Sequence, residues 1–174
     1  MHSSARLDLA EDVPRLLAAQ ATLHSRVRDR ALRLEIDWER NEVRWSGDLD
    51  RDAPARQPLA GTPATGTSLN LMLALAARRL APGEEVRYAL LERGRQRGVA
   101  YRAGHREAVE VPAGRFEAVP MQRQDDARRR TTTAWFDPYL PPAPVRMLQS
   151  ESGKARYELR LLRIEPLQAP ADAS

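Results

Sequence analysis

The chain has 174 residues, of which 42% are hydrophobic and 30% are charged, and its formal net charge is +4. A chain of this length can bury one substantial core, and this composition is typical of a globular domain, which excludes a fully disordered chain. The lack of cysteine excludes disulfides, thiolate metal sites and cysteine nucleophiles. No apolar run approaches the roughly 18 residues of a membrane-spanning helix, and the N-terminal residues do not resemble a signal peptide.

The charge distribution argues against a nucleic-acid partner. Lys154 is the only lysine among 28 basic residues, and the arginines are interspersed with 24 acidic residues. A nucleic-acid-binding surface would gather the positive charge beside aromatic side chains, whereas aromatics make up only 5% of this chain. The arginine bias is therefore interpreted as a solvated surface.

The first segment of the chain shows a helical pattern. Apolar or semi-apolar residues recur at helical spacing between about 11 and 24, namely Val13, Leu16, Leu17, Ala21 and His24. Acidic residues stand at its start, and Pro14 is compatible with a first helical turn. The pattern predicts a short amphipathic helix over about 11–24.

A β-hairpin is predicted next. Leu32, Leu34, Ile36 and Trp38 alternate with polar residues, and Val43 and Trp45 repeat this alternation after a turn at Asn41. Both tryptophans are then expected on one face of the hairpin. Residues 49–67 are rich in proline and glycine and have no period, which predicts a surface loop.

A well-marked helix is predicted over about 68–80. Its apolar residues lie at helical spacing, with Thr67 or Ser68 as the N-cap and Pro82-Gly83 beyond the end. The preceding "GTPATGTS" has the glycine spacing of a phosphate-binding loop, but Thr67 stands where that loop requires lysine. We therefore interpret this segment as a helix cap.

Strand-like segments with short turns fill the remainder of the chain. They cover about 85–94, 98–103, 107–111, 115–124, 129–137, 145–150 and 155–164, and the arginines of "QDDARRR" flank a solvent-exposed turn. The fold class is therefore predicted to be mainly β with minor α, a strongly curved antiparallel meander sheet or half-barrel packed on one helix. Residues 1–165 are expected to form a single domain, followed by a frayed tail over 166–174.

One constellation of side chains is a candidate ligand-binding surface. Aromatic residues share the strand phase of the apolar positions, and the helix adds two apolar side chains. The candidate ligand-binding residues are Trp38, Trp45, Leu69, Met72, Tyr88, Tyr101 and Trp135. Two interpretations remain open: the core of a curved sheet, or a concave apolar surface that holds a lipid-like or other amphiphilic ligand.

Catalytic and metal-binding patterns are weak. His2, His24 and His105 are separated along the chain and do not suggest a shared site. A hydrolase that uses a carboxylate such as Asp137 is the less favoured alternative. No catalytic residue, metal ligand or cofactor is predicted.

Most of the chain resembles a bacterial family known only as a domain of unknown function. The resemblance covers about residues 24–165 and is most specific between 112 and 161. It rests on a turn, a threonine-rich strand and a proline-bearing connection, represented by Pro112, Gly114, Thr131 to Thr133, Trp135, Phe136, Pro138, Pro144, Val145 and Arg146. The resemblance implies a curved sheet with a helix on its concave side, similar to periplasmic lipoprotein carriers, and it implies no known reaction.

The resemblance also carries expectations about location and function. Members of that family are typically exported and envelope-associated, and usually have a signal peptide and additional strands before the hairpin. This chain opens with a helix-like segment, so two explanations stay open: the chain is a shortened form without those strands, or its start codon is placed late. A cytoplasmic location then stays open, and a protein partner or a second copy is expected at the exposed sheet edge. The expected function is non-enzymatic binding of an amphiphilic ligand or a partner on the concave face, with a structural scaffold whose core is filled as the alternative.

Overall fold

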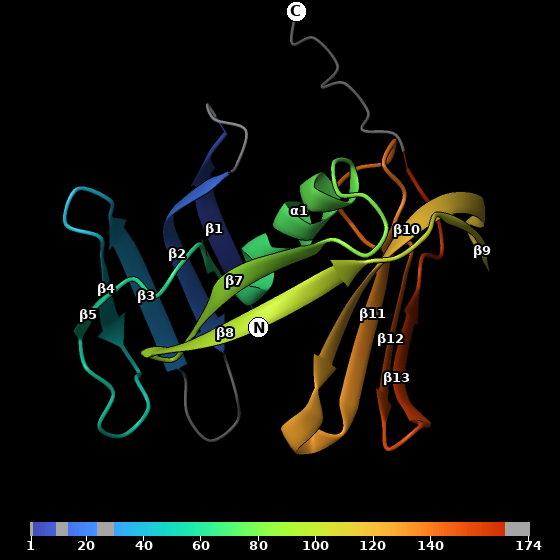
Figure 1. The fold of residues 1–174 in the computed structure, drawn as a ribbon. Coiled ribbons are helices and arrows are strands. Elements are labelled where there is room, and N and C mark those ends of the chain that lie inside the picture. The colour runs from blue at the N-terminus through green and yellow to red at the C-terminus, as the bar shows by residue number, and fades with distance from the viewer. Residues whose placement is uncertain (1, 10–13, 24–29, 166–174) are drawn as a thin grey trace, which may run out of the picture.

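The computed structural model describes residues 2–9, 14–23 and 30–165. Its strands form two largely antiparallel sheets, and a single α-helix, α1, lies between them in this part of the chain (Figure 1). The predicted mainly β class with minor α is confirmed. The strands divide into two sheets, however, and do not form one continuous meander.

The first sheet has five strands in chain order. They are β1 (His2–Asp8), β2 (Arg15–Leu23), β3 (Arg30–Asp37), β4 (Glu42–Gly47) and β5 (Arg56–Pro58). The hairpin of β3 and β4 was predicted, and Asn41 has the left-handed φ of 51° expected of its turn.

The predicted N-terminal helix is wrong, because residues 15–23 form β2 and pair with β1 and β3. Residues 11–13 and 24 of that prediction lie outside the described residues. The register shifts between Arg6, which faces Ala18, and Leu7, which faces Leu16, so Leu17 is left in a bulge. This bulge interrupts the two-residue alternation and leaves an apolar spacing that imitates a helix. Two strands, β1 and β2, therefore precede the hairpin, where the sequence predicted a helix.

The segment over 49–67 is more ordered than the predicted surface loop. It contributes β5, the short β6 (Pro63–Ala64) and the buried Thr65. Gln57 Nε2 donates to the carbonyl of Gly94 at 2.9 Å, and Gln96 Nε2 donates to the carbonyl of Pro58 at 2.7 Å. These bonds attach the segment to the turn that follows β7.

Helix α1 (Gly66–Ala77) begins two residues before the predicted start. Thr65, and not Thr67 or Ser68, is its N-cap. Thr65 Oγ1 accepts from the amide of Ser68 at 3.2 Å, and Ser68 Oγ accepts from the amide of Thr65 at 2.9 Å, which completes a capping box. The helix ends at its C-cap Arg78.

The second sheet has eight strands, seven of them in one path and the eighth, β9, paired beside it. They are β6, β7 (Glu85–Glu92), β8 (Arg95–Ala103), β10 (Gly114–Asp125), β11 (Arg130–Phe136), β12 (Arg146–Glu151) and β13 (Lys154–Arg160), while β9 (Glu107–Val111) pairs with β10. A short 3-10 helix, η1 (Asp126–Arg128), joins β10 to β11. The seven predicted strand segments are all present, but the turn after β7 lies at Arg93-Gly94, so β8 begins inside the predicted break.

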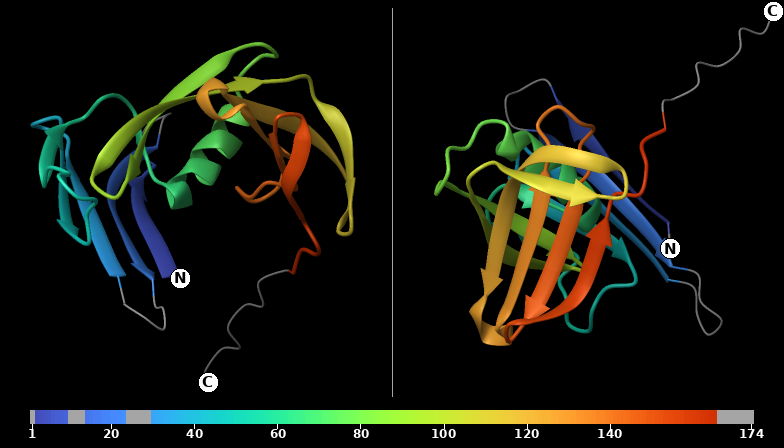
Figure 2. Two further views of the ribbon diagram at one scale, coloured as in Figure 1. Left: turned by 90° about the horizontal axis from the view of Figure 1, so that it is seen from below. Right: turned by 90° about the vertical axis from the view of Figure 1, so that its right-hand side faces the viewer.

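The two sheets form an arch around α1, with β7 and β8 across its top (Figure 2). The core between α1 and the second sheet contains Met72, Leu73, Tyr88, Tyr101 and Phe136. A second core lies under the first sheet around Leu16, Leu34 and Trp45. A third core lies beside β9, with Val109 and Trp135 among its members. Within this arch, the inner face of the first sheet lies opposite the start of α1.

Candidate functional site

A cavity of about 720 Å³ lies between the inner face of β1 to β3, the first turn of α1 and the end of β7. We call it the inner cavity. Its apolar wall is formed by Ala19, Ala21, Leu32, Leu34 and Leu91. Its polar rim includes Ser3, Thr65, Thr67, Asn70, Glu92 and Arg93.

Strand alternation explains the apolar wall. Ala19 pairs with Leu34, and Ala21 pairs with Leu32, so these four side chains occupy the same face of β2 and β3. The alanines on β2 are small, and they leave space above the two leucines. Arg33 and Glu35 alternate with the leucines on β3 and lie on the outer face, where they pair at 2.6 Å.

Hydrogen-bonding groups gather on the opposite side of the inner cavity. Thr67 Oγ1, in the first turn of α1, donates to Ser3 Oγ at 3.0 Å and so connects the helix to β1. Arg93 Nε lies 3.0 Å from Asp50 Oδ1, which holds the end of β7 against the segment after β4. The cavity therefore presents aliphatic surface on one side and hydroxyl, amide and charged groups on the other.

The seven residues nominated from the sequence do not share one surface, and none of them lines the inner cavity. Leu69, Met72, Tyr88 and Tyr101 belong to the core between α1 and the second sheet. Trp38 and Trp45 belong to the core under the first sheet, and Trp135 belongs to the third core.

Tyr88 illustrates how α1 packs against the concave face of the second sheet. Its side chain is 6% exposed, and its hydroxyl donates to the carbonyl of Met72 at 3.3 Å. Burial is the main cause that raises the pKa of Tyr88 from 10.0 to about 12. At this position the sheet holds packed core.

The tryptophans occupy three different environments. Trp38 Nε1 donates to the carbonyl of Leu16 at 3.0 Å. Trp45 is 5% exposed, and its Nε1 has no hydrogen-bond partner among the described residues. Trp135 lies on the face of β11 opposite Ala134 and Phe136, where its Nε1 donates to Glu107 Oε1 at 2.5 Å and the Arg146 guanidinium covers its ring at 4.9 Å.

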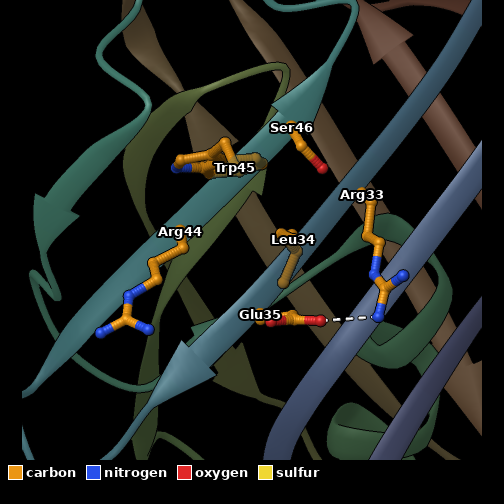
Figure 3. A pocket seen from close by; sticks show the side chains of 6 residues that line it. All are labelled: Arg33, Leu34, Glu35, Arg44, Trp45 and Ser46. Carbon is orange, nitrogen blue, oxygen red and sulfur yellow. Dashed lines mark hydrogen bonds and ion pairs between the residues drawn. The ribbon is translucent and has the colours of Figure 1, made fainter.

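A smaller hollow of about 300 Å³ lies at β3 and β4, and Figure 3 shows the residues that line it, among them the nominated Trp45. Its charged side chains are already paired. Arg33 contacts Glu35, as the dashed line in Figure 3 marks, and Arg44 contacts Glu42 at 2.9 Å and Asp37 at 2.8 Å. These pairs stiffen the outer face of the hairpin, so the hollow is a weaker candidate site than the inner cavity.

The alternative site at Asp137 has a local structural role. Its Oδ1 accepts from the amide of Tyr139 at 2.9 Å in the turn that follows β11. Within residues 2–9, 14–23 and 30–165, three or more His, Asp or Glu side chains do not converge on a position that could hold a metal ion. The same residues include no helix with the length and apolar character needed to cross a bilayer.

Sequence reasoning nominated Leu32 and Leu34 as inward-facing strand residues, but it missed the rest of the inner cavity. Ala19 and Ala21 fell within the predicted helix, and Thr65 within the predicted loop. The available signal was the family expectation of strands before the hairpin, which would have made residues 15–23 a strand.

Comparison with known proteins places the whole fold in one family. Neither the curated proteins nor the solved structures that were compared include a significant match to the chain. The family described as "Protein of unknown function (DUF3108)" matches residues 2–160, a span that includes both sheets and α1. The chain therefore belongs to the DUF3108 family.

Proposed function

We propose that this protein is a non-enzymatic binding domain that holds an amphiphilic ligand in the inner cavity. The observation that carries the proposal is a volume of about 720 Å³ with an apolar wall and a polar rim. Small-molecule sites are typically concave spaces of about 300–1,000 Å³ with mostly apolar walls and a few placed polar groups. The sequence pointed to a ligand on a concave sheet face. We place the ligand at the inner face of the first sheet, because α1 packs against the nominated residues of the second sheet.

The two sides of the inner cavity suit the two ends of an amphiphile. Leu32, Leu34 and Leu91 offer surface for an alkyl chain, whose burial contributes about 0.8 kcal/mol per methylene group. Thr67 and Asn70 offer hydrogen bonds to a polar group at the start of α1. An envelope location is part of the proposal and is supported only by the resemblance to exported proteins.

Organic-solvent extraction of the purified protein followed by mass spectrometry tests whether an amphiphile co-purifies. Titration calorimetry with dodecyl maltoside then measures binding directly. Replacing Ala21 by Trp should fill the space between β2 and α1 and reduce dodecyl maltoside binding at least about tenfold. Ala18→Trp is the matched control, because Ala18 lies on the opposite face of the same strand.

Equal dodecyl maltoside binding by the Ala21→Trp and Ala18→Trp variants, with both folded by circular dichroism, would remove the inner cavity as the site. Absence of any bound amphiphile in the wild-type protein, both after purification and after titration, would remove the function itself.

A second candidate function is assembly through the edge of the second sheet. Among the residues that the structure describes, strand β13 pairs with β12 alone, and it is exposed along its whole length. Tyr157 and Leu159 are 49% and 46% exposed on it. An unpaired edge with apolar side chains favours pairing with the same edge of a second copy. Light scattering should then report a dimer that Leu159→Lys converts to a monomer, and a wild-type monomer would exclude this assembly.

A further inference from the structure

A second pocket lies on the inner face of the second sheet, beyond the end of the core that α1 covers. Strands β8 and β10 pair only at Ala103 with Met121 and at Arg102 with Gln122, whereas β10 and β11 remain paired to the end of their hairpin. Where β8 diverges from β10, a pocket of about 130 Å³ opens. We call it the arginine pocket.

Four guanidinium groups and one carboxylate line this pocket. They belong to Arg97 on β8, Arg123 and Asp125 on β10, Arg128 in η1 and Arg130 on β11. Arg123 and Asp125 are two and four residues from Met121, and Arg130 is four residues from Ala134, so these side chains occupy the same sheet face as the α1 core. The pairing register thus brings arginines that are far apart in the sequence close together, where they outnumber the carboxylates that line the pocket.

The arginines have few partners for their N–H groups. Their contacts to carboxylates are long: Arg123 and Arg97 lie 3.6 and 3.9 Å from Asp125, Arg97 lies 3.6 Å from Glu92, and Arg130 lies 3.8 Å from Glu151. Buried donors are normally paired, yet Arg130 Nε is buried without a hydrogen-bond partner among the described residues. The side chain of Arg123 is only 17% exposed.

Guanidinium groups converge on one space, their carboxylate contacts are long, and one buried N–H has no partner in the described part of the chain. This arrangement matches the chemistry of an oxyanion. Arginine presents a planar fork of N–H groups that fits phosphate or carboxylate oxygens, and such charge-assisted bonds are about twice as strong as neutral ones. A volume of about 130 Å³ accommodates a tetrahedral oxyanion, since one water molecule takes about 30 Å³ in the liquid.

The arginine pocket adjoins the inner cavity. Glu92 lines the inner cavity, Arg97 lines the arginine pocket, and Glu92 Oε2 lies 3.6 Å from Arg97 Nη2. A molecule with an apolar chain in the first space can therefore place a charged group toward the second.

We propose that the arginine pocket binds a phosphoryl-type oxyanion, and that this anion is the head group of the amphiphile held in the inner cavity. The first half of this inference stands on the arginines alone, whereas the second half rests on the proposed function. The ligand class is thereby narrowed from amphiphiles in general to anionic amphiphiles.

Three probes separate these claims: inorganic phosphate, dodecyl phosphate and the uncharged dodecyl maltoside, each titrated at constant ionic strength. The wild-type protein should bind inorganic phosphate, and should bind dodecyl phosphate about tenfold or more tightly than dodecyl maltoside. Raising the salt concentration should weaken only the two phosphate probes, because charge interactions are screened.

Arg123→Gln and Arg128→Gln should each weaken both phosphate probes about tenfold and leave dodecyl maltoside unchanged. Arg128 is exposed in η1, so its replacement carries little risk to folding. Arg115→Gln is the matched control, because Arg115 is an exposed arginine on β10 outside the pocket, and it should bind all three probes like the wild type.

Phosphate binding that is unchanged in both pocket variants would overturn the inference. Binding of dodecyl maltoside without preference for dodecyl phosphate would overturn the head-group role, while the proposed function would stand. Binding of inorganic phosphate alone, lost in Arg128→Gln, would support the anion site and overturn both the head-group role and the proposed function.

Discussion

Glu92 and Arg97 form an ion pair, with 3.6 Å between Oε2 and Nη2, at the boundary between the inner cavity and the arginine pocket. The pair crosses from β7 to β8 near the turn at Arg93-Gly94. This turn is also attached to Gln57 of β5 and to Asp50 in the segment after β4. The β7–β8 hairpin therefore contributes residues to both candidate binding spaces, and its position affects the shape of each.

The cap of α1 should control the stability of the helix end that faces the inner cavity. Thr65→Ala removes the Oγ1 that accepts from the Ser68 amide, and it should lower the free energy of unfolding by about 1 kcal/mol. Thr67→Ala, which removes an exposed hydroxyl outside the capping box, should change it by less than about 0.5 kcal/mol. Urea denaturation measures both, and equal effects would contradict the role given to Thr65.

The Trp135–Glu107 hydrogen bond should appear as an energetic coupling. A double-mutant cycle with Trp135→Phe and Glu107→Ala should give a coupling free energy of about 1 kcal/mol or more, as expected for a hydrogen bond to a charged acceptor. A cycle that uses Glu110→Ala, an exposed neighbour on β9, should give a coupling near zero. Trp135→Phe should leave dodecyl maltoside affinity unchanged, since Trp135 does not line the inner cavity, and a large loss of affinity would contradict its placement.

Tyr88 should make the protein sensitive to alkali. Its pKa is raised from 10.0 in the unfolded chain to about 12 in the fold, mainly by burial. A raised pKa adds stability that is complete below pH 10 and is lost as the pH rises through about 12. The loss amounts to about 2–3 kcal/mol.

Tyr88→Phe should reduce this alkaline loss, although it removes the bond to the Met72 carbonyl at neutral pH. Tyr139→Phe is the control, because Tyr139 is 83% exposed, and it should keep the wild-type pH dependence. The test is to measure the free energy of unfolding of each variant between neutral pH and about pH 11. An identical dependence of this free energy on pH in both variants would refute the raised pKa of Tyr88.

Gly47, at the end of β4, should be harder to replace than Gly98 in β8. Its φ is +96°, and an added Cβ would lie 2.1 Å from the carbonyl oxygen of Ala31. Gly47→Ala should therefore cost about 2 kcal/mol or more. Gly98→Ala, whose Cβ would meet nothing within 4 Å, should cost less than about 1 kcal/mol, and thermal unfolding of the two variants compares them.

The sequence patterns predicted elements whose period is undisturbed. The alternation of Leu32, Leu34 and Ile36 identified β3, and the spacing of Met72, Leu73 and Ala76 identified α1. In β2 the bulge at Leu17 broke the period, and its alanines and leucines have high helix propensity. Pairing with β1 and β3 overrode that local preference.

The candidate site was harder to predict, because it depends on how distant segments meet. Trp135 has the strand phase of a buried residue. Phase alone does not show which face of the sheet is meant, because both faces of β11 are covered: α1 covers one face and β9 covers the face that carries Trp135. The turn at "QDDARRR" is exposed, as predicted, yet Arg130 lies inward and meets Arg97 from β8. Only the register of β10 and the divergence of β8 bring these charges together.

The central claim is that one anionic amphiphile occupies both the inner cavity and the arginine pocket. Amide chemical shifts of the labelled wild-type protein, followed during titration with dodecyl phosphate, test it most directly. The account predicts saturable shifts at Leu32, Leu34 and Leu91 together with Arg97, Arg123 and Arg130, with one common dissociation constant. Shifts confined to β13, or a complete absence of shifts at the apolar wall, would contradict it.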